Sequence, residues 1–128
     1  MDYLWAKLRL GYVELREGNI LEARQVFAET AQDFQKDGNS IGVVLALEWM
    51  ASLNVAVGKP EYPARLIGWP EATRKVIGDT CPLVEQADVD HDVAAVVARL
   101  GSTAFEEADN KGRAMTFDEA VEYALDGG

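Results

Sequence analysis

The segment from Leu10 to Asp37 constrains the fold more than any other part of this chain, because it reads as two helices joined by a glycine turn. Gly11 is small enough to lie where two helices approach closely, and seven residues later Gly18 interrupts the helical pattern. Ala23 and Phe27 then follow four residues apart, so they share one face of the next helix. The segment predicts an antiparallel helical hairpin.

A weaker echo of this hairpin follows 40 residues later, where Ala51 corresponds to Gly11 and Gly58 corresponds to Gly18. Repeated hairpins stack to bury a continuous core, and they present a surface instead of carrying chemistry of their own. The repeat therefore indicates binding and regulation, although it does not identify a ligand.

Apolar residues recur at helical spacing along the chain, and no segment alternates with a period of two over a useful length. The third predicted helix is apolar on most faces, which is typical of a helix in the middle of its domain. We expect about seven helices, over residues 3–16, 20–36, 41–57 and 85–100 and in segments that begin near residues 63, 103 and 117.

Local signals predict where several of these helices begin and end. Ser40 is suited to cap the third helix, and Pro70 should break or kink the fourth unless a new helix starts there. Thr103 and Thr116 each have a glutamate three residues later, which is the capping-box spacing. The residues 110–112 are expected to end the sixth helix.

These patterns predict an all-α fold in which antiparallel hairpins stack as a short right-handed array. We expect a single helical-repeat domain over residues 1–128. Its first hairpin would cover residues 1–39, its second 40–77, and its C-terminal capping helices 83–128.

The composition excludes some classes of function. The chain has 128 residues, a formal net charge of −10 and a sequence pI of about 4.4, so its surface should repel nucleic acid and anionic lipid. The longest apolar run, residues 41–47, is too short to cross a bilayer. Asp2, Lys7 and Arg9 interrupt any early apolar run, and Cys81 is the only cysteine, so we expect a cytoplasmic protein without a signal peptide.

Several short motifs resemble known families. The first hairpin resembles a tetratricopeptide repeat, and the second half resembles the C-terminal helical region of bacterial LuxR-type activators with an NTPase core and of cyclase-linked predicted ATPases. The motifs that carry this second resemblance are Gly58-Lys59-Pro60-Glu61, Ala64-Arg65-Leu66-Ile67-Gly68, Leu100-Gly101 with Phe105, Gly112-Arg113-Ala114-Met115-Thr116 with Glu119-Ala120, and Ala124-Leu125.

The resemblance implies a sensor or interaction segment of a bacterial signalling or transcription regulator. Such regulators carry a phosphate-binding loop and often a DNA-binding helix-turn-helix, and this chain has neither G-x-x-x-x-G-K-[ST] nor a basic recognition helix. The chain would then be a segment of a longer protein or a stand-alone relative.

The first helix of each hairpin in a stacked array lines the concave face, which predicts where a partner or ligand would bind. Aromatic and arginine side chains are common binding anchors. The residues predicted to line this groove are Trp5, Leu8, Tyr12, Arg16, Glu48, Ser52 and Val55. The alternative is that Trp5 and Tyr12 only cover the core or a preceding repeat. We also expect the first helix to self-associate or to contact domains of a parent protein, because it is apolar on more than one side.

The densest group of potential metal ligands lies at residues 88–92, but it lacks the glycine and the final carboxylate of an EF-hand calcium loop. His91 is the only histidine, so a zinc site is not predicted, and the acidic residues suit the first turn of a helix. We expect no catalytic residue, metal or cofactor. Two alternatives remain open: a small metal-dependent enzyme that uses His91, Asp90 and Cys81, or a purely structural oligomerisation domain.

Overall fold

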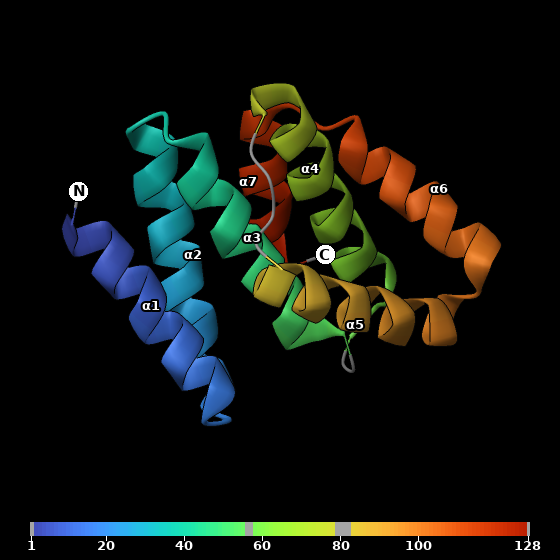
Figure 1. The fold of residues 1–128 in the computed structure, drawn as a ribbon, viewed down its shortest axis with the longest axis horizontal. Helices are drawn as coiled ribbons and strands as arrows, with labels where there is room; N and C mark the ends of the chain where they lie inside the picture. The colour runs from blue at the N-terminus through green and yellow to red at the C-terminus, as the bar shows by residue number, and fades with distance from the viewer. Residues whose placement is uncertain (1, 56–57, 79–82, 128) are drawn as a thin grey trace.

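A computed structural model of the chain describes residues 2–55, 58–78 and 83–127. Over these residues the fold is all-α, as predicted, and contains no strand. The seven helices of the described residues are α1 (Asp2–Arg16), α2 (Ile20–Lys36), α3 (Ser40–Asn54), α4 (Glu61–Ile77), α5 (Leu83–Leu100), α6 (Ser102–Arg113) and α7 (Phe117–Asp126) (Figure 1).

The first hairpin forms as its glycines predict. Gly18 has a φ of +84°, a left-handed conformation that favours glycine at the turn between α1 and α2. Gly11 lies against α2, where an added Cβ would come within 2.7 Å of the ring of Phe27. Ala23 and Phe27 are fully buried. The close approach of α1 and α2 therefore depends on Gly11 facing the ring of Phe27 without a side chain of its own.

Helix α3 lies in the middle of the molecule, as its apolar sequence predicts. It packs against α1, α2, α4, α5 and α7, and in Figure 1 it runs between the α1–α2 pair and α4. Its buried side chains join those of α2, α4 and α7 in one hydrophobic core. The largest fully buried side chains of this core are Phe27, Phe34, Leu8, Leu47, Leu66, Val43, Val44, Val96 and Val121.

From α1 to α4, each helix packs mainly against the next helix in the sequence. Helix α4 departs from this order, because it packs more closely against α6 than against α5. Gly68 of α4 faces the backbone of Asp109, and Gly112 of α6 faces the backbone of Arg65. A Cβ at either glycine would overlap these backbone atoms. Gly112 therefore marks a helix crossing, and α6 ends at Arg113, one residue beyond the predicted stop at residues 110–112.

Other local predictions also need correction. Pro70 neither breaks α4 nor starts a new helix, and its ring is fully buried inside the continuous helix, which offsets part of the missing backbone hydrogen bond. Asn39, not Ser40, caps α3, since its side chain accepts a 3.0 Å hydrogen bond from Gly42 N. Gly101 precedes α6 without a side-chain cap, so the capping box predicted at Thr103 is wrong.

The capping box predicted at Thr116 is confirmed, because Thr116 Oγ1 accepts from Glu119 N and Glu119 Oε1 accepts from Thr116 N.

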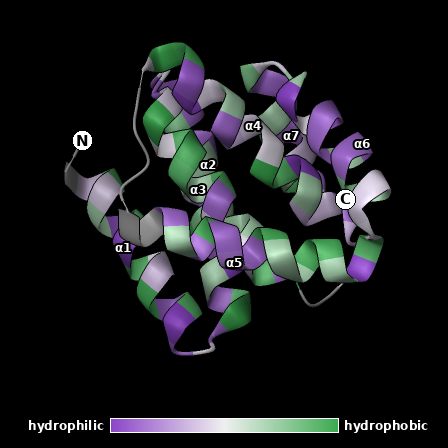
Figure 2. Cartoon of the chain, turned by 45° about the vertical axis from the view of Figure 1, so that its right-hand side comes forward, coloured by the Kyte–Doolittle hydropathy of each residue, from purple (hydrophilic) through white to green (hydrophobic). Residues whose placement is uncertain are grey.

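Helices α1 and α5 carry both hydrophobic and hydrophilic residues along their length (Figure 2). On α1, Tyr3, Leu10 and Val13 are 70%, 53% and 46% exposed. Within the described part of the chain, no helix is long and apolar enough to span a membrane.

Candidate functional site

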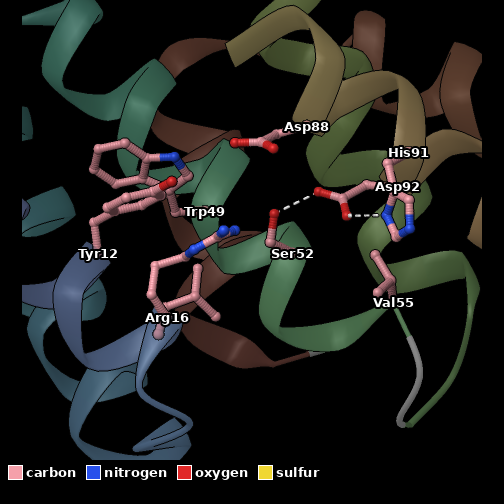
Figure 3. Close-up of a pocket in the computed structure, with 9 residues that line it drawn as sticks. Tyr12, Arg16, Trp49, Ser52, Val55, Asp88, His91 and Asp92 are labelled. Atoms are coloured by element: carbon pink, nitrogen blue, oxygen red, sulfur yellow. Dashed lines mark hydrogen bonds and ion pairs between the residues drawn. The ribbon is translucent and has the colours of Figure 1, made fainter. Parts of the chain in front are cut away.

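A groove of about 370 Å³ lies between α1, α3 and α5, and residues from all three helices line it (Figure 3). The three helices are brought together from the N-terminal hairpin, the central helix and the C-terminal half of the chain. The lining residues are Tyr12, Leu15 and Arg16 of α1, Trp49 and Ser52 of α3, Val55 directly after α3, and Asp88, His91 and Asp92 of α5.

One wall of the groove is aromatic. The rings of Tyr12 and Trp49 lie 4.8 Å apart between centroids, with an interplanar angle of 39°. Trp49 also contacts Phe27 of the core, at 5.8 Å between ring centroids, so the aromatic wall is anchored from behind. The guanidinium carbon of Arg16 lies 5.8 Å from the centroid of the Tyr12 ring, within the range of a cation–π contact.

The opposite wall is acidic. Asp88 and Asp92 are four residues apart on α5, so their side chains lie on the same side of that helix. Ser52 donates its hydroxyl hydrogen to Asp92 Oδ2, and His91 Nδ1 lies 3.8 Å from Asp92 Oδ1 (Figure 3). Burial raises the pKa of Asp92, because the charged carboxylate loses hydration, and the hydrogen bond from Ser52 opposes that shift.

Four of the seven side chains predicted to line the groove do line it, namely those of Tyr12, Arg16, Ser52 and Val55. The other three lie elsewhere: the ring of Trp5 packs on Phe34 at 4.8 Å between centroids, and Leu8 is only 1% exposed in the core. Glu48 turns toward α4 and accepts a hydrogen bond from Arg74 at 2.9 Å.

Sequence reasoning missed the contribution of α5 to the groove. Asp88 and Asp92 stand out in the sequence as an acidic cluster, but nothing in the spacing shows that α5 crosses near α1 and α3. Trp49 reads as one more apolar residue of α3, since a tryptophan that faces a groove and one that faces the core give the same pattern.

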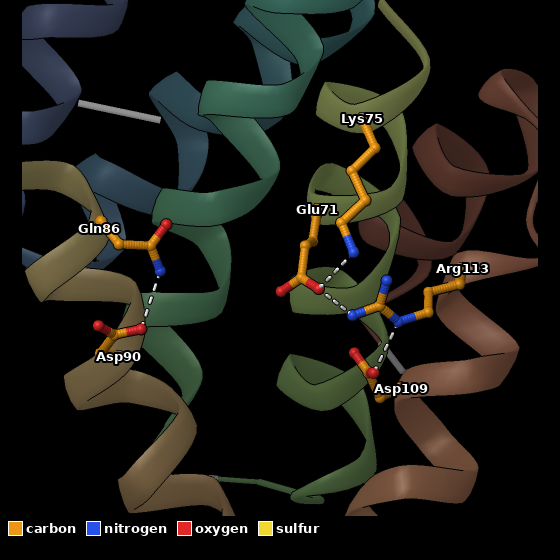
Figure 4. A network of polar contacts seen from close by, with 6 residues as sticks. All are labelled: Glu71, Lys75, Gln86, Asp90, Asp109 and Arg113. Atoms are coloured by element: carbon orange, nitrogen blue, oxygen red, sulfur yellow. Dashed lines mark hydrogen bonds and ion pairs between the residues drawn. The ribbon is translucent and has the colours of Figure 1, made fainter. Parts of the chain in front are cut away.

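Two residues of the alternative enzyme, Asp90 and His91, lie in the part of the chain that the structure describes. Asp90 accepts a hydrogen bond from Gln86 Nε2 at 2.8 Å on the same helix (Figure 4). The His91 side chain is 83% exposed. Cys81 lies outside the described residues. No group of three or more His, Cys, Asp or Glu side chains among the described residues could hold a metal ion.

A second polar cluster lies where α4 meets α6. Arg113 Nε donates to Asp109 Oδ2 at 2.8 Å, and Arg113 Nη2 pairs with Glu71 Oε1, which Lys75 approaches to 3.8 Å (Figure 4). Arg113 belongs to the motif at residues 112–116, and this cluster spans the same crossing as Gly68 and Gly112. The cluster joins two helices, and none of its residues lines the groove.

Comparisons with family models, curated proteins and solved structures found no match to this chain. The geometry of the groove and the motif resemblance are therefore the support for a function.

Proposed function

We propose that this chain is a non-enzymatic helical-repeat module that binds a protein partner or ligand within a bacterial signal-transduction or transcription regulator. The observation that carries this proposal is the groove between α1, α3 and α5, which has an aromatic wall and faces solvent. Aromatic residues in a concave, partly apolar site are the usual anchors of recognition. The motif resemblance supports the assignment to bacterial regulators.

The groove also supports a mechanism of regulation. Its lining residues come from α1 and α5, which are distant in sequence, and from α3 between them. A ligand that contacts both outer helices would favour the arrangement in which they lie together. Such a ligand would shift the equilibrium between this arrangement and one in which the helices lie apart. The size of the shift, which a linked output domain would sense, is set by the difference in the ligand's affinity for the two arrangements.

The outer face of α1 is a second candidate contact surface. Tyr3, Leu10 and Val13 are exposed there, and Ile20 and Leu21 are exposed at the start of α2. Self-association or a parent protein's domain would cover these side chains. Light scattering of the purified chain over a range of concentrations tests self-association, and assembly without any ligand would favour the structural oligomerisation alternative.

The proposed function is tested by ligand and partner screening with a groove variant beside the wild type. Tyr12→Ala removes one face of the aromatic wall, and Arg9→Ala is the control because Arg9 is exposed on the same helix and does not line the groove. We expect compounds or partners that stabilise the wild type and the control against heating but not Tyr12→Ala. A hydrolase or metal-binding signal that His91→Ala abolishes would instead favour the enzyme alternative.

A further inference from the structure

We infer that the groove between α1, α3 and α5 receives a guanidinium side chain, an arginine carried by a segment of a partner protein. This inference rests on the proposed binding function and specifies what the groove recognises.

The aromatic wall has the geometry that a guanidinium needs. Tyr12 and Trp49 present adjacent rings, and Arg16 already holds its own guanidinium carbon 5.8 Å from the Tyr12 centroid. A planar cation near a ring face is attracted by the negative face of the π system. Figure 3 shows the Arg16 side chain reaching into the groove between the aromatic wall and Ser52. The chain thus contains an internal example of the proposed contact.

The opposite wall supplies counter-charge. Among the described residues, Asp88 makes no ion pair with a lysine or arginine. Asp92 Oδ1 lies 3.8 Å from His91 Nδ1, and these two groups form an ion pair only when the histidine is protonated. Partial burial disfavours the charge of Asp92, so a cation in the groove would restore part of the interaction that the carboxylate loses with water. A guanidinium has a fork of N–H donors that suits carboxylate oxygens.

Charge and size both favour a single cationic side chain over an anion. The chain carries a net charge of −10, which attracts cations and repels anions at long range. Within the groove, two carboxylates face the one guanidinium of Arg16. Its volume of about 370 Å³ is at the low end of the range for small-molecule sites, which suits one side chain more than a large ligand.

The test uses acetyl-arginine amide, with acetyl-citrulline amide as the probe of the same shape but without charge. Each probe is titrated into the ¹⁵N-labelled chain and followed by NMR. The indole N–H resonance of Trp49 reports on the groove, and those of the other tryptophans serve for comparison. We expect saturable shifts with the arginine probe and binding weaker by about tenfold with the citrulline probe. Equal binding of the two probes would overturn the inference.

Variants locate the site. Asp88→Asn together with Asp92→Asn should weaken arginine binding by about tenfold. Asp90→Asn is the matched control, since Asp90 is exposed on the same helix and pairs with Gln86 away from the groove. Thermal unfolding followed by circular dichroism verifies that each variant is folded. An unchanged affinity in the folded double variant would overturn the inference.

Arg16→Gln separates a cation site from an anion site. If the groove receives cations, removing the resident guanidinium should leave arginine binding unchanged or make it tighter. If acetyl-glutamate amide binds the groove and Arg16→Gln abolishes that binding, the groove recognises anions and the inference is wrong. In that case a partner whose binding depends on Tyr12 would still support the proposed function, so the two proposals can fail separately.

Discussion

Two successive turns on one face of α3 differ in how they meet their neighbours. Toward α4, Glu48 forms a buried ion pair with Arg74, whose side chain is only 8% exposed. One helical turn away, Ser52 faces the open groove and donates to Asp92 of α5. Both contacts join α3 to another helix through a carboxylate. The first is closed to water, whereas the second lies beside the open groove, so one face of α3 carries a closed contact and an open one in consecutive turns.

The contact between α4 and α6 is also closed. Gly68 and Gly112 allow two helix backbones to touch, and neither position has space for a side chain. The groove is lined instead by large side chains, including Tyr12, Trp49 and Arg16. Small residues bring helices together, and large residues between less closely packed helices leave a concave surface.

The largest effect is expected from breaking the buried ion pair. Arg74→Met should destabilise the protein by about 3 kcal/mol, because it leaves the carboxylate of Glu48 buried without its partner. Urea unfolding measures the change. The double variant Glu48→Leu/Arg74→Met removes both charges and should recover much of the lost stability. If the single and double variants are equally unstable, lost packing and not an unpaired charge explains the effect.

A smaller loss is expected at the crossing of α4 and α6. Gly112→Ala should lower the free energy of unfolding by about 2 kcal/mol, because its Cβ would overlap the carbonyl of Arg65. Alanine is otherwise the better helix former, so the opposite sign would show that the two backbones are not in contact. Lys111→Ala, at the exposed neighbouring position, is the control and should change stability little.

The stability of the closed contact between α4 and α7 should also respond to alkaline pH. Tyr62 donates its hydroxyl hydrogen to the carbonyl of Ala124 at 2.6 Å, and burial raises its pKa to about 12 from the ordinary value of 10.0. The folded state keeps this proton longer than the unfolded state does, so the contribution to stability is present below pH 10 and is lost as the pH rises through about 12.

Ultraviolet titration of phenolate formation should show the late ionisation, and Tyr62→Phe should remove it while Tyr123, whose pKa is also raised, still titrates. An unchanged titration curve in Tyr62→Phe would contradict the assignment.

The smallest effect on stability is expected at the groove. Asp92→Asn should leave stability at neutral pH unchanged or raise it slightly, since burial raises the pKa of Asp92 and the fold therefore favours its neutral form. The sign follows from linkage: this contribution is present below the ordinary pKa of 3.8 and is lost as the pH rises through the raised value in the fold. Urea unfolding of the wild type and Asp92→Asn from pH 3.5 to pH 7 would measure it. A large loss at pH 7 would show that the ionised carboxylate stabilises the fold.

Much of the helical framework could be predicted from local sequence. The boundaries of α2 match the prediction, and Gly11, Gly18 and Thr116 have the roles that their positions indicate. Predictions fail where the local conformational preference of a residue differs from what its tertiary packing requires. Pro70 is a helix breaker by local preference, but its buried ring packs inside the continuous helix α4.

The sequence by itself determined an all-α chain with a glycine-turned hairpin and a central apolar helix, because these features depend on residue spacing within single helices. Tertiary structure alone decided the crossing of α4 with α6 and the position of α5 beside the groove. Helical periodicity shows which face of a helix is apolar, but it does not show which distant helix covers that face. For that reason Tyr12, Arg16 and Ser52 could be selected from the sequence, whereas Asp88 and Asp92 join them only in the folded chain.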